Sequence, residues 1–372
     1  MTNQNDLSNE SADIGDYLKL IACTAVMLQT ILSLCLQTNP TIKTQMRIGI
    51  TYNLVKFTAP AFIFGILYTT TRTTINSDIT YAHYLRKQWH ASFVPTIWWT
   101  SIYLLVMPWL QQVNHYHHLA EFCWQFINGN AAPHLWYNTM MLQFIVLMPV
   151  FWEIGHFSVK SSRRGITMAA LTTVIAVSWL LFYDQQVFHG PHMHDWYLLD
   201  RFFLSFIIFG VFGTLAWQFR CWFNYWLKRW WPLLILALLI SFYWTNQELF
   251  SFQFPVKLTN APYYKPSMLI YDLSAILLIA AIARYQIDRH HYMTNLVHLF
   301  ANFAYKAFLS NVFWDQLLWL SFGKSLTIQH PLLGILAVYV GTWCLSFASA
   351  FTIHWGWHRL QVAIISIFKS VS

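Results

Sequence analysis

Three polar side chains lie deep inside long apolar stretches, where a membrane protein places the residues that do its chemistry. Lys56 lies about eight residues into one run, and Thr30 and Asp315 lie roughly 12 or 13 residues into runs that enter from the opposite side. At a rise of about 1.5 Å per residue, all three reach nearly the same depth in a hydrocarbon core of about 30 Å. A lone charge at that depth costs about 3 kcal/mol or more. We therefore expect Lys56 to face a polar cavity or to form an ion pair with an acid. Asp315 is favoured over Asp272 as that acid, and the ion pair could serve function or only structure.

Histidines form the second group of chemically capable residues, and most of them lie in loops. Two clusters stand out, namely His115, His117 and His118, and His189, His192 and His194. They lack cysteine partners and the helical i, i+4 spacing of many metal sites. The five cysteines are scattered, without metal-ligand spacing. We therefore predict solvated loop histidines, with a pH-sensing outer surface as the alternative, and neither a metal site nor a disulfide framework.

The elements that must position these residues are membrane helices. Hydrophobic residues make up 57% of the chain and charged residues only 10%, against about 25% in soluble domains. The net charge of +8 could suggest nucleic acid, but the basic residues lie in short clusters between apolar runs, as in membrane-protein loops. We expect a lipid bilayer as the surrounding medium and no nucleic-acid partner.

The stretch Asp16–Pro40 predicts the first membrane helix, because no charge interrupts it between Lys19 and Lys43. Its acidic, polar leader differs from the basic start of a signal peptide. Nine further apolar runs follow, at about Ile48–Thr70, Ala91–Val113, Leu135–Ile154, Ile166–Tyr183, Trp196–Trp217, Trp231–Thr245, Ser267–Ala283, Phe303–Phe322 and Leu332–Trp357. The sequence thus predicts an all-α bundle of about ten transmembrane helices over residues 16–372, after a disordered cytoplasmic tail at residues 1–15.

Basic residues indicate the orientation of the bundle. One set of alternating loops holds most of the lysines and arginines, and the other holds only Lys43, Arg47, Lys257, Lys265 and Lys324. Lysine and arginine are retained on the cytoplasmic side. We therefore expect a multi-pass cell-membrane protein with both termini in the cytoplasm.

Several stretches together resemble one family. Residues 17–22, Tyr-Leu-Lys-Leu-Ile-Ala, and 25–30, Ala-Val-Met-Leu-Gln-Thr, resemble the opening helix of acyltransferase family 3, the integral-membrane O-acyltransferases of surface polysaccharides. Further similar segments follow in the family's order, at residues 84–87 with 94–95, 133–137, 201 with 209–213, and 308–311. The likeness is nearest to the branch typified by the intercellular-adhesion polysaccharide protein C.

The resemblance implies roles for individual residues. Lys19, Arg86 and Lys87 stand where the family is thought to hold a phosphate-bearing acyl donor, and His90 is the nearest substitute for a missing second arginine. Lys56, Arg201 and Asp315 would line the cavity. Thr30 and Asn311 stand where many members have histidine, the first of these being the catalytic base. Threonine cannot serve as a general base, so the base would be His90 or His134, the histidines near helix entries.

Two functions remain open on this basis. In the first, the protein transfers an acyl group from a cytoplasmic donor similar to acyl-CoA, used as substrate without a further cofactor. The acceptor would be a hydroxyl of a surface glycan or of its lipid-linked precursor. In the second, it is a non-catalytic relative that acts in polysaccharide export or as a pseudoenzyme partner of a polysaccharide synthase. The missing histidines favour the second, and the basic loop with the intramembrane lysine favours the first.

Overall fold

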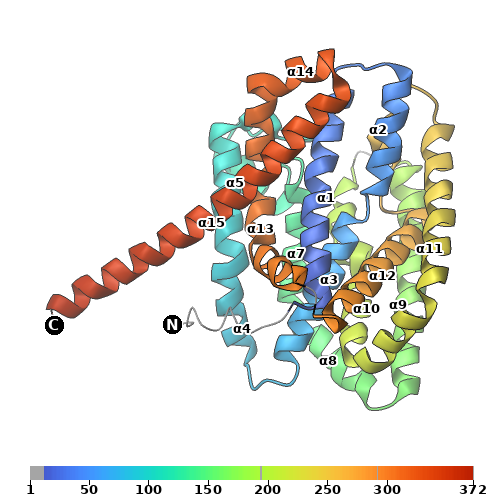
Figure 1. Cartoon of the computed structure of the whole chain (residues 1–372), viewed down its shortest axis with the longest axis vertical. Helices are drawn as coiled ribbons and strands as arrows, with labels where there is room; N and C mark the ends of the chain where they lie inside the picture. The colour runs from blue at the N-terminus through green and yellow to red at the C-terminus, as the bar shows by residue number, and fades with distance from the viewer. Residues whose placement is uncertain (1–11, 193–194, 291, 372) are drawn as a thin grey trace.

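The computed structural model describes residues 12–192, 195–290 and 292–371, and within them every regular element is helical. The α-helices are α1 (Ile14–Leu36), α2 (Ile42–Leu54), α3 (Thr58–Thr74), α4 (Tyr81–Gln88), α5 (Val94–Val106), α6 (Leu119–Asn128), α7 (Leu135–Val146), α8 (Met148–Val159), α9 (Ser162–Tyr183), α10 (Ile207–Gln218), α11 (Arg220–Ser251), α12 (Pro266–Asp288), α13 (Met293–Leu318), α14 (Lys324–Gln329) and α15 (Pro331–Val371). The predicted all-α class is confirmed. Figure 1 shows them as one bundle, with the C-terminal part of α15 extending away from it.

Helix α1 begins earlier than the sequence predicted. Asp13 is its N-cap, and its side chain accepts a hydrogen bond from the backbone N–H of Asp16 while the Asp16 side chain accepts from that of Asp13. This reciprocal capping satisfies amides that have no partner within a helix. The sequence predicted a disordered tail over residues 1–15, but residues 12–15 are ordered. Residues 1–11 lie outside the described part.

Prolines break two of the predicted helices. The run Ile48–Thr70 was expected as one helix, but α2 ends at Leu54 and α3 begins at Thr58. Proline clashes with the carbonyl four residues before it, and for Pro60 that residue is Lys56. Pro149 acts in the same way in the fourth run, where α7 and α8 meet at a bend of 56°. Lys56 therefore lies at a helix break and not within a regular helix.

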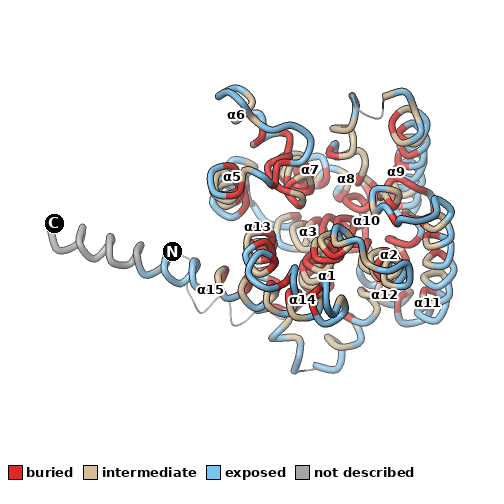
Figure 2. Tube along the Cα trace, turned by 90° about the horizontal axis from the view of Figure 1, so that it is seen from above, coloured by how far each residue is buried: buried red, intermediate tan, exposed pale blue. Residues whose placement is uncertain are grey.

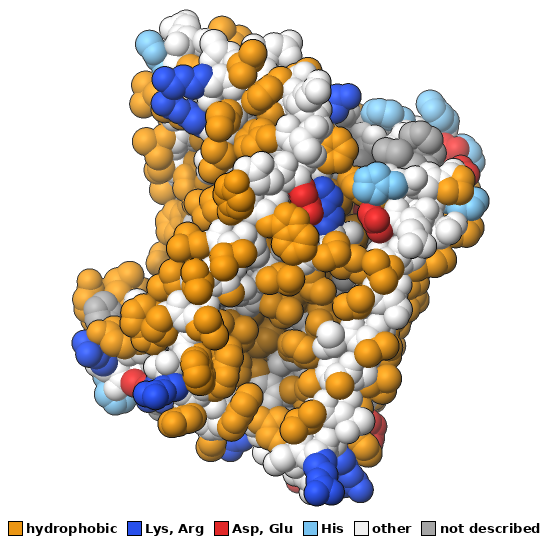
Figure 3. Space-filling view, turned by 90° about the vertical axis from the view of Figure 1, so that its right-hand side faces the viewer, with side chains coloured by type: hydrophobic (Ala, Val, Ile, Leu, Met, Phe, Trp, Pro, Cys, Tyr) orange, Lys and Arg blue, Asp and Glu red, His pale blue; other side chains and the backbone are white. Residues whose placement is uncertain are grey.

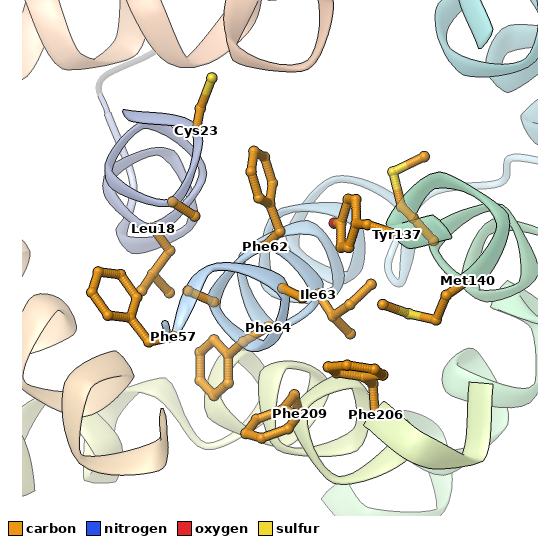
Figure 4. Packing of buried hydrophobic residues seen from close by; sticks show 14 of the residues in the cluster. Leu18, Cys23, Phe57, Phe62, Ile63, Phe64, Tyr137, Met140, Phe206 and Phe209 are labelled. Atoms are coloured by element: carbon orange, nitrogen blue, oxygen red, sulfur yellow. The ribbon is translucent and has the colours of Figure 1, made fainter. Parts of the chain in front are cut away.

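Glycines allow α3 to pack closely at the centre of the bundle. A Cβ atom on Gly15 of α1 would lie 2.6 Å from the Gly65 carbonyl oxygen, and one on Gly213 of α10 would lie 2.5 Å from the Phe64 carbonyl oxygen. Small residues permit such close backbone contact between membrane helices. Figure 4 shows the apolar side chains of α1, α3, α7 and α10 that surround these contacts. Helix α3 is therefore the central element of the core.

Among the residues that the structure describes, six helical segments are long and apolar enough to cross a membrane, or seven if the bent pair α7 and α8 is one span. The most buried is the α2–α3 segment, whereas less than a third of α9, of α11 and of the first part of α15 is buried. In Figure 3 a wide apolar surface covers the middle of the molecule, and most Lys and Arg side chains lie toward its two ends. This is the surface expected of a multi-pass membrane protein.

Each of the ten predicted runs contains a helix, but not all of these meet the requirements for a span. Helices α5 and α10 are short, with 13 and 12 residues, and α13 is not among the candidate spans. The apolar runs are longer than α5 and α10 because apolar side chains continue into the one-turn segments before α10 and after α5. Run length alone therefore overestimated the length of these two helices. The count of ten spans stays a prediction.

Candidate functional site

A cavity of about 400 Å³ lies between α1, the α2–α3 break and the segment that leads into α7. Thr30, Lys56 and His134 all line it, although they are far apart in the sequence. Gln29, Gln316 and Tyr137 add further polar groups to its wall. The sequence predicted that Thr30 and Lys56 lie at similar depth, and the structure brings them to one cavity. Sites of this size with few polar groups are typical of small-molecule binding.

Lys56 is buried among tyrosines. Its Nζ donates a hydrogen bond to the Tyr52 hydroxyl at 2.9 Å, and it lies 4.3 Å from the centre of the Tyr263 ring. The Tyr263 hydroxyl is in turn hydrogen-bonded to the Thr58 hydroxyl at 2.9 Å. Aromatic faces stabilise an ammonium group through their quadrupole. The ring and hydroxyl contacts therefore hold the cation at the cavity wall.

The expected ion pair between Lys56 and Asp315 is absent. Among the residues that the structure describes, Lys56 forms no ion pair within 4 Å, and Asp272 is the acid whose charge acts on it. Asp315 is fully buried on α13, and neither of its oxygens has a hydrogen-bond partner in the protein. The depth estimate from the sequence carried no information about which face of α13 Asp315 occupies.

This correction leads to a thermodynamic prediction. We expect Lys56→Met and Asp272→Asn to be coupled in a double-mutant cycle of thermal stability, by about 0.5 kcal/mol or more, because each charge stabilises the other. Lys56→Met combined with Asp315→Asn should be additive within about 0.5 kcal/mol. Additivity in the first pair, or strong coupling in the second, would contradict this assignment.

His134 is the histidine of the cavity. It is 4% exposed, and its Nε2 lies 3.3 Å from the Leu309 carbonyl oxygen. An Nε2–H that donates to this carbonyl leaves Nδ1 as an unprotonated acceptor, and Nδ1 has no partner among the described residues. Burial lowers the pKa of His134 to about 3, so the ring is neutral at physiological pH. Its rival from the sequence, His90, is exposed and does not line the cavity.

A second cavity, of about 360 Å³, adjoins the first and shares Gln112, Pro133 and Trp136 with it. Arg201 lines this second cavity, where it donates to the Asn128 carbonyl and to Asn130 Oδ1 at 2.7 Å. Asp200 accepts from Arg201 Nε at 3.2 Å, but burial still raises the pKa of Asp200 to about 6. Arg201 was expected in the same cavity as Lys56, and it lies in the neighbouring one.

Thr30 and Asn311, the two positions where histidine was expected, lie on two helices that pack together, α1 and α13. Helices α1 and α13 run parallel, because Asp16 contacts His298 and Cys23 donates to the Ala304 carbonyl. The Thr30 hydroxyl donates to the Val26 carbonyl at 3.3 Å, and Asn311 is buried and does not line the cavity. Neither side chain can act as a base.

The expected donor-binding residues lie away from both cavities. Arg86 and Lys87 are exposed on α4, at the lower end of the bundle in Figure 1. Lys19 lies near the same end and pairs with Asp16 at 2.8 Å. Asp16 also contacts Nδ1 of His298 at 2.7 Å. The structure therefore separates these three basic residues from Lys56, Arg201 and His134.

The loop histidines form local contacts instead of a metal cluster. His118 pairs with Glu121 at 3.1 Å and His189 with Asp184 at 3.0 Å; His194 lies outside the described residues. Within the described ranges no group of three or more His, Cys, Asp or Glu residues is placed to hold a metal ion.

Sequence reasoning missed several cavity residues. Tyr52 and Tyr263 hold Lys56, and Gln29 and Gln316 face the same space. The glutamines carried a usable signal, since each is a polar residue within an apolar run. Tyr263 carried none, because it belongs to a loop.

Comparison with known proteins identifies no relative. No protein-family model, no curated protein and no solved structure matches this chain.

Proposed function

We propose that this protein is a membrane-embedded O-acyltransferase, which moves an acyl group from a donor similar to acyl-CoA to a hydroxyl of a surface polysaccharide or its precursor. The observation that carries the proposal is the shared cavity, whose wall includes a buried cation, Lys56, and a neutral histidine, His134, whose Nδ1 has no partner in the protein. Acyl transfer needs both functions, a base for the hydroxyl and a positive charge for the developing oxyanion.

The groups would act as follows. His134 Nδ1 accepts the proton of the acceptor hydroxyl while its oxygen attacks the acyl carbon. Lys56 stabilises the negative charge that develops on the carbonyl oxygen. The C–S bond of the thioester then breaks, and the proton moves from His134 to the departing thiolate. A base with a pKa near 3 has little driving force for proton uptake. An anionic group of the bound substrate must therefore raise the pKa of His134 during the reaction.

The two cavities suit a sugar acceptor. Trp136 belongs to both walls, and Trp109, Tyr137 and Tyr263 line the first cavity. Flat aromatic faces beside glutamine amides are a common surface for sugar rings, since they offer apolar contact and directional hydrogen bonds. The acceptor would enter from the side of the α1–α2 connection, opposite to α4.

The proposal includes an orientation, with α4 and both termini in the cytoplasm and ten crossings in total. A cysteine placed at the exposed Asn76, in a background without the five native cysteines, should react with an impermeant maleimide only after the cells are opened. A cysteine at Asn114 should react in intact cells. Labelling of position 76 from outside would reverse the topology.

Arg86 and Lys87 are proposed to bind the charged head of the donor. Replacing both by alanine should weaken donor binding more than tenfold, about 1.4 kcal/mol, because charge-assisted contacts to phosphate are lost. Arg163→Ala with Arg164→Ala removes an equally exposed basic pair and is the matched control. Equal effects of the two double variants would mean that only general surface charge is involved.

One observation favours the alternative, a non-catalytic member that serves polysaccharide export or a synthase. Both positions expected to hold histidine are occupied by residues that cannot act as a base, Thr30 and Asn311. In that case the cavity would bind the glycan without acyl transfer.

Turnover of the purified protein in lipid nanodiscs separates the two functions. The enzyme should release thiol from an acyl-CoA donor and form an acceptor ester detected by mass spectrometry. Thr30→His adds a base to the same cavity and should increase that turnover. No ester from the native protein, together with none from Thr30→His, would refute the enzymatic proposal.

A further inference from the structure

A group of polar side chains lies without protein partners between α13 and α15. Asn311 and Asp315 on α13 are 1% exposed, and Thr342 and Ser346 on α15 are fully buried. Both side-chain atoms of Asn311, both carboxylate oxygens of Asp315 and the two hydroxyl oxygens lack a hydrogen-bond partner in the protein. Buried polar groups are nearly always satisfied, so this group needs an explanation.

Contacts above and below bring Asp315, Thr342 and Ser346 to the same part of the interface, and Asn311 lies one helical turn before Asp315 on α13. Trp314 Nε1 donates to the Ser349 hydroxyl at 3.1 Å, and a Cβ atom on Gly341 would lie 2.8 Å from the Leu318 side chain. The two helices are therefore antiparallel here. Asp315 lies between the two contacts on α13, and residues 342–346 lie between them on α15.

Helical geometry places the polar side chains on one side of that interface. Each residue that follows along a helix is rotated by about 100°, and the sense of rotation is reversed in the antiparallel partner. Asn311 and Asp315 are the residues directly after Ser310 and Trp314, which lie in the interface. Thr342 is likewise the residue directly after Gly341. They therefore emerge on the same side of the α13–α15 pair.

Helix α1 closes this side. Ile31 of α1 packs with Trp319 and Val338, and the Trp343 indole donates to the Thr24 hydroxyl at 3.3 Å. Figure 2 shows α1 and α13 next to each other within the bundle. The polar group thus occupies a junction of three helices, and none of its four side chains lines the cavity of Lys56 and His134.

We propose that this junction binds a monovalent alkali cation. Carboxylate, amide and hydroxyl oxygens are the ligands that hard cations prefer. The site holds one carboxylate, and neither oxygen of Asp315 has a hydrogen-bond partner among the described residues. One monovalent cation neutralises Asp315, whereas a divalent ion would leave a net charge in the apolar interior. The proposal is independent of acyl transfer.

The test is the melting temperature of the full-length protein in detergent, with NaCl or KCl replaced by choline chloride at constant ionic strength. A cation that binds only the folded state should raise the melting temperature in a saturable manner. Asp315→Asn should abolish this dependence. Asp272→Asn removes another fully buried carboxylate without hydrogen-bond partners and should retain it.

A milder variant covers the case in which Asp315→Asn does not fold. Thr342→Val with Ser346→Ala removes two neutral ligands and should weaken the apparent cation affinity at least tenfold, also in direct binding of radioactive Na⁺. Absence of any Na⁺ or K⁺ effect on the native protein would overturn the proposal, since Asp315 would then be neutralised by a proton. A cation effect that persists in Asp315→Asn would also overturn it.

Discussion

Lys56→Met is expected to reduce acyl transfer by roughly 10²- to 10³-fold, the effect of removing one preorganised group that stabilises an oxyanion. Methionine preserves the length and apolar character of the lysine stem and removes only the cation. Lys56 is 7% exposed and lies over the Tyr263 ring at the cavity wall, so its charge acts in a dry environment where electrostatic effects are strong. The loss should appear in kcat more than in KM, because the oxyanion develops only in the transition state.

Lys265→Met is the matched control for this experiment. Lys265 is 9% exposed, donates to the Asn260 carbonyl at 2.8 Å and lies near Glu248. It resembles Lys56 in burial but lines neither cavity. Its replacement should leave turnover within about twofold of the native protein, while it changes stability by about as much as Lys56→Met does. A comparable loss of turnover in both variants would indicate damage to the fold and not to the site.

His134→Gln is expected to reduce turnover by about 10²- to 10⁴-fold, the usual contribution of a general base. Glutamine can place an N–H near the position of His134 Nε2 and so keep the hydrogen bond to the Leu309 carbonyl, but its amide cannot take up a proton. His156→Gln is the control, because His156 Nε2 also contacts a carbonyl, that of Ile75 at 3.2 Å, outside the cavities. Turnover that survives in His134→Gln would exclude His134 as the base.

The same variant should change the response of stability to acid. The pKa of His134 falls from about 6.5 in the unfolded chain to about 3 in the folded one, so below pH 6.5 the unfolded state binds the extra proton. The stability that depends on neutral His134 is therefore fully present above pH 6.5 and is lost as the pH falls toward 3. His134→Gln should lose less stability over this window than the native protein, as measured by thermal melts at several pH values.

Apolar run length was enough to predict helices, but not where they break. The run at Ile48–Thr70 and the run at Leu135–Ile154 each contain a proline, and both prolines divide the helix. Their effect could have been predicted, because the clash with the carbonyl four residues earlier is local. The shortness of α10 could not, since tertiary packing decides whether Phe203–Phe206 continues the helix as a regular turn.

The candidate site was predictable in part. Depth along a helix follows from residue counting, and this placed Thr30 and Lys56 together. The partners of Lys56 depend on the rotation of each helix about its axis, which neighbouring side chains determine. Tyr52 and Tyr263 could not be assigned for that reason, and Asp315 was assigned to the wrong cluster.

The contacts of Asp16 have a consequence for biosynthesis. Its partner His298 lies 282 residues later in the chain, so the ribosome delivers α1 to the membrane long before α13 exists. During that interval Lys19, one turn away, is the cation available to Asp16 within the same helix. The ion pair with Lys19 lets the first helix enter the membrane interface with the charge of Asp16 already neutralised. His298 then forms its contact with the Asp16 carboxylate after α13 has been synthesised.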